Sequence, residues 1–132
     1  MVLVRKSTLM FAGILTLALA LAACGGSPQE EAMEDQVDLL EEAAGIFEGV
    51  KDEASAKAAG AKLKSLDGRI KELEKRVSAL PTPTEEEARK LHEKYGKRIE
   101  AVQARIMKES MRIAMNPQLA AAMPDDLSVL GR

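Results

Sequence analysis

Cys24 carries the only thiol of the 132-residue chain, so an internal disulfide is excluded. An unpaired thiol is unusual in an oxidising compartment unless it is chemically capped. Before it, the basic residues Arg5 and Lys6 lead into an apolar run over residues 8–21, and small residues close the segment. A basic start, a short apolar stretch and small residues are the three parts of a secretory signal. We therefore expect residues 1–23 to be a signal peptide and Cys24 to be modified.

Leu21, Ala22 and Ala23 directly precede Cys24. This tetrad resembles the lipobox of bacterial lipoproteins, and the resemblance covers residues 1 to about 25 of the chain. It implies that the sulfur of Cys24 takes a diacylglyceryl group. It also implies that a signal peptidase cleaves before Cys24 and that the new amino group is acylated. An uncleaved membrane anchor and an ordinary secreted protein are the alternatives that the sequence leaves open.

The same resemblance implies where the protein is held. Several acyl chains give stable membrane anchoring, at about 0.8 kcal/mol for each buried CH₂ group. Gly25 follows the cysteine, and an Asp at that position resembles an inner-membrane retention signal in Gram-negative families. Its absence favours the outer membrane over the inner one, if the organism is Gram-negative. Membrane lipid, bound through acylated Cys24, is therefore the first expected partner.

Met107, Met111 and Met115 recur every four residues, and Met123 follows them. Thioethers are soft ligands that suit Cu(I), so a copper site is one hypothesis for this cluster. An apolar patch that binds a peptide or a protein partner is a second hypothesis. Methionine at helical spacing is more often adaptable core filling, and we therefore expect these side chains to belong to the core.

His92 is the only histidine, and no second ligand lies at the spacing that a zinc site requires. We expect it to be a solvated surface residue. No serine or threonine can be matched to it as a nucleophile with its base, and no phosphate-binding glycine loop is present. The net charge of −2 argues against nucleic acid, which needs a basic face. We expect no catalytic residues and no cofactor apart from the covalent lipid.

The composition points to an all-α fold that positions these residues. Ala, Leu, Glu, Lys and Met dominate, aromatic residues make up 2%, and no run of β-branched residues suggests a strand. Apolar residues at helical spacing predict three long helices and a short fourth one. A flexible tether should precede them and a tail should follow. The expected ranges are residues 24–29 for the tether, 30–50, 53–80, 85–115 and 117–123 for the helices, and 124–132 for the tail.

Local signals mark where these helices begin. Asp52 is expected to cap the second helix, and Thr84 with Glu87 forms a capping box for the third. Pro117 should occupy the first position of the short helix. The second helix has the clearest heptad pattern, with alternating steps of three and four. Its apolar positions are Ala56, Ala59, Leu63, Leu66, Ile70, Leu73, Val77 and Leu80.

Short linkers make neighbouring helices antiparallel, so we predict an antiparallel three-helix bundle, or a long helical hairpin, after an N-terminal signal helix. The first helix is strongly acidic and the other two have a basic excess, so we expect the first to lie beside both. We also expect the alanine-rich start of the second helix to pack against the methionine-rich end of the third. The linker at residues 81–84 should lie at the same end as Cys24.

The anchor is the only specific functional signal in the sequence. We expect a non-enzymatic, lipid-anchored protein of the bacterial cell envelope, whose helical module has a structural or partner-binding role. The mature part resembles, only generically, small helical lipoproteins without an assigned function. An envelope protein or a second copy of the chain is the expected protein partner. The alternatives are Cu(I) handling through Met107, Met111 and Met115, and a self-associating coiled coil.

Overall fold

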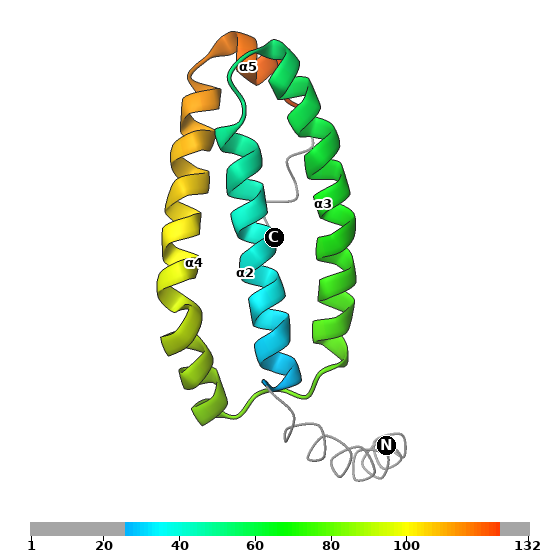
Figure 1. Cartoon of the computed structure of the whole chain (residues 1–132), viewed down its shortest axis with the longest axis vertical. Helices are drawn as coiled ribbons and strands as arrows, with labels where there is room; N and C mark the ends of the chain where they lie inside the picture. The colour runs from blue at the N-terminus through cyan, green and yellow to red at the C-terminus, as the bar shows by residue number, and fades with distance from the viewer. Residues whose placement is uncertain (1–25, 125–132) are drawn as a thin grey trace, which may run out of the picture.

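The computed structural model describes residues 26–124, which form four α-helices and no strand (Figure 1). The helices are α2 (Pro28–Glu48), α3 (Glu53–Ala79), α4 (Glu85–Ala114) and the short α5 (Pro117–Ala122). The predicted all-α fold is confirmed, and each helix begins and ends within two residues of its predicted range. The expected signal peptide and lipobox, and the tail from residue 125 onward, lie outside the described residues.

Side-chain caps set the helix starts. Asp52 caps α3 and Thr84 caps α4, each in a capping box with the residue three positions later, so both predicted caps are confirmed. The predicted start of the first helix is wrong by two residues. Ser27 accepts the backbone N–H of Glu30 at 3.2 Å, and Pro28 fills the first helical position. The predicted tether therefore stops before Ser27, because a Ser-Pro start signal was missed.

α2 lies between α3 and α4 and packs along both of them (Figure 1). Leu39 and Ala43 are buried in a core cluster with residues of α3. Val37 and Ala44 are also fully buried, on the flank of α2 that adjoins its ion pairs with α4. The bundle is therefore an open arrangement in which the first helix, not the second, is central.

α3 and α4 do not pack along each other as they pack along α2. The predicted contact between the alanine-rich start of α3 and the methionine-rich end of α4 is therefore wrong. Leu80 and Thr84 both have extended backbones, so the linker between α3 and α4 passes across the end of α2 instead of turning tightly (Figure 1). Among the long helices, each of the two then buries its apolar stripe against α2 only, and the short α5 covers their distal ends.

Ion pairs join the acidic face of α2 to both neighbours, which confirms the expected charge complementarity. Exposed ion pairs stabilise a fold only weakly because water and salt screen them, so these pairs select the neighbours of α2 more than they stabilise the fold. The pairs toward α3 are Arg69–Glu42 and Arg76–Asp35. The pairs toward α4 are Lys94–Glu30, Arg105–Glu48, and Arg98 with Glu34, Asp38 and Glu41.

Two sets of contacts close the ends of the domain. At one end, the side-chain amide of Gln29 donates to the carbonyl oxygen of Pro81 at 3.2 Å, which ties the first turn of α2 to the α3–α4 linker. At the other end, Arg112 donates to the carbonyl oxygens of Phe47 and Val50 at 3.2 and 2.7 Å. The linker lies at the end where the described chain begins, and we call this the proximal end; the prediction named Cys24 at this end, and Cys24 lies outside the described residues.

Candidate functional site

The methionine stripe, which we define as Met107, Met111 and Met115, lies on the outer surface of α4. The exposed fractions of these side chains are 66%, 59% and 81%, so the prediction that they belong to the core is wrong. α4 buries the face that carries Tyr95 against α2. At about 100° per residue, Met107 and Met111 lie about 120° and 160° around the helix from Tyr95. Because α3 does not pack on α4, no second long helix covers them.

The stripe concentrates exposed apolar surface at one end of one helix. Among the described residues only one other large apolar side chain, Val77 at 47%, is exposed. Ala104 and Ala114 extend the apolar surface on either side, since both are exposed on α4. Methionine side chains are flexible and polarisable, and they are common at surfaces that adapt to a partner. The stripe can therefore bind an apolar surface without a preformed pocket.

The spacing of the thioethers limits what the stripe can do with a metal ion. Met107 and Met115 lie about 12 Å apart along the helix axis, so neighbouring pairs are better placed than all three to share one ion. In the described part of the chain, no group of three or more His, Cys, Asp or Glu residues is placed to hold a metal ion. A Cu(I) site here would therefore depend on pairs of thioethers.

His92 is exposed on α4, as predicted. Its imidazole lies over the buried backbone of Gly96, since a Cβ atom added there would be 3.3 Å from Cε1 of the ring. This contact gives the ring a packing role one turn along its own helix.

A polar cluster at the α2–α4 boundary was not predicted from the sequence. Tyr95 is only 2% exposed, and its hydroxyl donates to the carboxylate of Glu34. This hydrogen bond, together with burial, raises the pKa of Tyr95, so the phenol stays protonated at neutral pH. The same bond lowers the pKa of Glu34, as does Arg98, which donates to it at 3.0 Å. The cluster links α4 to α2 through the contacts of Tyr95 and Arg98 with Glu34.

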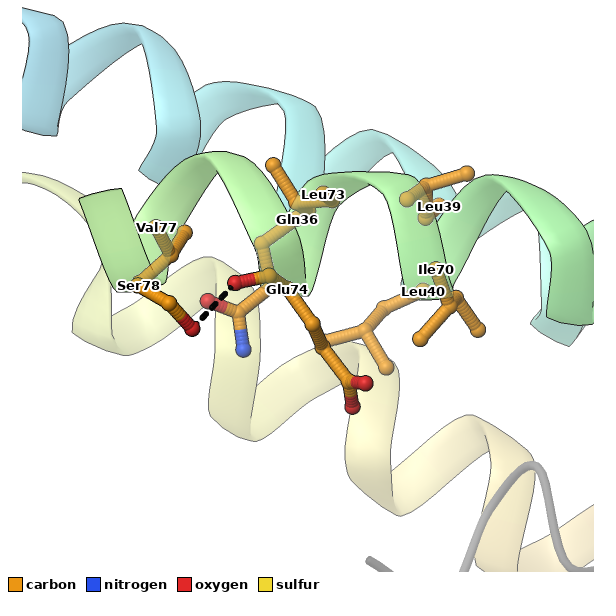
Figure 2. A pocket seen from close by; sticks show the side chains of 8 residues that line it. All are labelled: Gln36, Leu39, Leu40, Ile70, Leu73, Glu74, Val77 and Ser78. Carbon is orange, nitrogen blue, oxygen red and sulfur yellow. Dashed lines mark hydrogen bonds between the residues drawn. The ribbon is translucent and has the colours of Figure 1, made fainter. Parts of the chain in front are cut away.

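An apolar groove runs over α2 and α3 (Figure 2), and none of the residues that form the α2–α3 ion pairs lines it. Its volume is about 500 Å³, and a neighbouring hollow of about 390 Å³ continues it to the linker and to Leu91 of α4. The sequence did not predict it, because packing of α3 against α4 would have filled this space. The residues that line the groove are Gln36, Leu39, Leu40, Ile70, Leu73, Glu74, Val77 and Ser78.

No protein-family model matches the sequence, and neither the curated proteins nor the solved structures gave a significant match. None of the helices within residues 26–124 is long and apolar enough to cross a membrane. The predicted lipidation site Cys24 and the lipobox residues Leu21, Ala22 and Ala23 lie outside the described residues, so their role stays a prediction.

Proposed function

We propose that this chain is a lipid-anchored, non-enzymatic protein of the bacterial cell envelope that binds a partner protein through the methionine stripe. The exposure of Met107, Met111 and Met115 is the observation that carries the proposal. Apart from Val77, the other large apolar side chains of the described domain are buried or half-buried. A concentrated patch of exposed apolar side chains is typical of a binding surface.

The proposed anchor and the stripe lie at opposite ends of the domain. The described chain begins at residue 26, two positions after Cys24, and Gln29 holds this end beside the α3–α4 linker. Met111 follows the start of α4 by 26 residues, which is about 39 Å along a helix. A lipid on Cys24 would therefore hold the domain by its proximal end and direct the stripe away from the membrane. Gly25 favours the outer membrane in a Gram-negative organism.

The interior of the domain supports binding rather than catalysis. Catalytic sites usually gather polar groups with shifted pKa values inside a pocket. Among the described residues no charged or amide side chain is buried. Two carboxylates with lowered pKa values, Glu34 and Glu48, instead form ion pairs with arginines of α4 at the surface. Their pKa shifts therefore reflect the joining of two helices.

Two triple variants test the stripe. In the first, Met107, Met111 and Met115 are each replaced by Gln, which removes the apolar surface. In the second, all three are replaced by Leu, which keeps the apolar surface and removes the sulfur. A photoreactive residue in place of the neighbouring Ala104 would report partners by cross-linking in intact cells, and the same residue in place of exposed Lys62 on α3 is the control.

We expect the chain to cross-link to a partner from position 104 and not from position 62. The Gln variant should lose this cross-link and the Leu variant should keep it. Because the three side chains are exposed, neither variant should change the free energy of unfolding by more than about 0.5 kcal/mol. Equal cross-linking by the Gln variant and the parent chain would show that the stripe is not the binding surface.

The anchor is tested separately by Cys24→Ser in the full-length chain. We expect this variant to incorporate no labelled palmitate and to escape lipoprotein-type processing, because the acylated sulfur is gone. Labelling equal to that of the parent chain would refute the proposed lipidation. The triple variants keep Cys24, so failure of the anchor and failure of the stripe are distinguishable.

Cu(I) handling is the second candidate function, and the exposure of the three thioethers favours it, since a metal ion can reach their sulfurs. Titration with Cu(I) separates it from protein binding, because the Leu variant keeps the apolar surface but has no thioether at these positions. Loss of tight Cu(I) binding in the Leu variant supports a metal site. Unchanged affinity excludes one at the stripe.

The third hypothesis, a self-associating coiled coil, draws on the heptad of α3. Within one chain most of this heptad already packs into the core, since Ala56, Leu63, Leu66 and Leu73 are buried there. The later part of the heptad stays partly open, since Ile70 and Leu80 are half-buried and Val77 is exposed. This hypothesis requires the purified chain to sediment as an oligomer, and a monomer would exclude it.

A further inference from the structure

The domain has three long helices around a space that a fourth helix fills in a four-helix bundle. At the distal end α5 occupies this space, because it packs against both α3 and α4. Phe47 lies beneath it and is only 1% exposed, in one core cluster with Leu119 and Met123. α5 has only six residues, so the rest of the space is left to the groove over α2 and α3.

Apolar side chains in the groove are incompletely buried. Val77 is 47% exposed, and Leu40 and Ile70 are half-buried, although Leu66 of the same α3 stripe is 1% exposed. Val77, Leu40 and Ile70 belong to the regular apolar stripes of their helices. The sequence therefore supplies apolar residues for a contact that residues 26–124 do not make. A segment that covered them would remove this apolar surface from water.

The chain leaves α5 on α3, the helix that also lines the groove, about 15 Å before the groove begins. A Cβ atom added to Gly60 of α3 would lie 3.2 Å from the ring of Pro124, so Pro124 packs directly on the backbone there. Phe47, Met123 and Pro124 also line a small hollow between α2, α4 and α5. From Gly60 to Ile70 is about 15 Å along α3, and to Val77 about 26 Å.

We propose that residues 125–132 bind in the groove over α2 and α3, with Val129 against Leu40 and Ile70 and with Leu127 at the entrance of the groove ahead of it. Extended chain advances about 3.3 Å per residue, so residue 127 can reach about 10 Å beyond Pro124 and residue 130 about 20 Å. In an extended segment residues 127 and 129 point to the same side. The proposal concerns how the chain completes its own core, so it is independent of the anchor and of the methionine stripe.

Charge along the path supports this direction of the segment. Lys64 follows Gly60 by one turn on the same side of α3, and the acidic pair Asp125 and Asp126 would pass it first. Glu74 lines the far part of the groove, about 21 Å from Gly60, and the long side chain of Arg132, whose backbone would arrive at about 26 Å, can reach back to it. Each end of the segment would therefore meet the opposite charge.

Accessibility of a cysteine in the groove tests the proposal in the full-length chain in intact membranes. Ile70→Cys provides the probe, Met111→Cys on the exposed stripe is the control, and the chain without an added cysteine gives the background. We expect a maleimide to label position 70 much more slowly than position 111. Replacing Leu127 and Val129 by Ser should speed labelling at position 70 about tenfold, as loss of about 1.4 kcal/mol of binding free energy would, and leave position 111 unchanged.

A disulfide trap checks the contact directly. Ile70→Cys combined with Val129→Cys should form an intramolecular disulfide under mild oxidation, whereas Lys62→Cys with Val129→Cys should not. Labelling at position 70 that is unaffected by the two Ser substitutions overturns the proposal. So does a disulfide that joins two chains, because a second copy would then fill the groove. Every variant keeps Cys24, and only the Met111→Cys control alters the methionine stripe, so failure here leaves the proposed function standing.

Discussion

Arg112→Met tests how the distal end of α2 is held in place. α2 has no basic residue in its last turn, and Arg112 of α4 supplies one by donating to the carbonyl oxygens of Phe47 and Val50. Glu109 orients the guanidinium through an ion pair at 2.6 Å. The contact joins residues more than 60 positions apart, so it acts between helices and not within one.

The expected loss follows from the two hydrogen bonds. A hydrogen bond from a charged donor contributes about 1.5–3 kcal/mol, and the Arg112 side chain is 37% exposed, so water partly replaces what is lost. We therefore expect Arg112→Met to lower the free energy of unfolding by about 2 kcal/mol in total. In a domain of this size, that corresponds to a drop in Tm of about 8–16 °C.

Urea denaturation of the parent and variant chains measures this effect. Arg112→Lys is the matched control, because lysine keeps the charge but cannot bridge two carbonyl oxygens with one planar group. The free energy of unfolding of Arg112→Lys should fall between those of the parent and Arg112→Met. Glu109→Gln should lower it by less than either Arg112 variant does. If Arg112→Met lies within about 0.5 kcal/mol of the parent, the carbonyl contacts do not stabilise the distal end and our reasoning fails.

Three further predictions concern the core, pH and salt. Phe47→Ala should cost about 3–5 kcal/mol in urea denaturation, because Phe47 is 1% exposed, whereas Met115→Ala should cost almost nothing. The pKa values of Glu34 and Glu48 are lowered in the folded state. Their contribution to the free energy of unfolding is therefore fully present above pH 4.5 and is lost as the pH falls through the folded-state pKa values. Urea midpoints measured from pH 7 to pH 3 should decline less steeply for Glu34→Gln; an equally steep decline would refute this assignment. Raising the salt concentration should lower Tm in the parent and less so in Glu48→Gln, since screening weakens exposed ion pairs.

Helix positions could be predicted well because the signals that set them are local. The caps at Asp52 and Thr84 each involve a partner three residues away, and both were recognised. The start of α2 was missed only because Ser27 and Pro28 were assigned to the tether. The acidic character of α2 also predicted correctly that it lies beside both other long helices.

The candidate site was harder to predict, because the spacing of apolar residues along a helix does not show which face of the helix a neighbouring helix will cover. The three methionines have the spacing of a core stripe, yet α4 has one long neighbour and turns the face with Tyr95 toward it. The groove was missed for the same reason, since two amphipathic helices joined by a short linker were expected to pack together. Their linker instead passes across the end of α2.

Amino-acid order was therefore sufficient for the fold class, the helix ends, the charge preference of α2 and the hypothesis of a lipidated Cys24. All of these depend on residues close together in the chain or on the net charge of a segment. Packing in three dimensions settled which helix is central, that Met107, Met111 and Met115 face outward, and that Arg112 holds a helix end that is distant in sequence. The physical reason is competition. α3 and α4 could have buried their apolar faces against each other, but both pack against α2 instead. This packing leaves uncovered the methionine stripe and the groove, on which our two proposals rest.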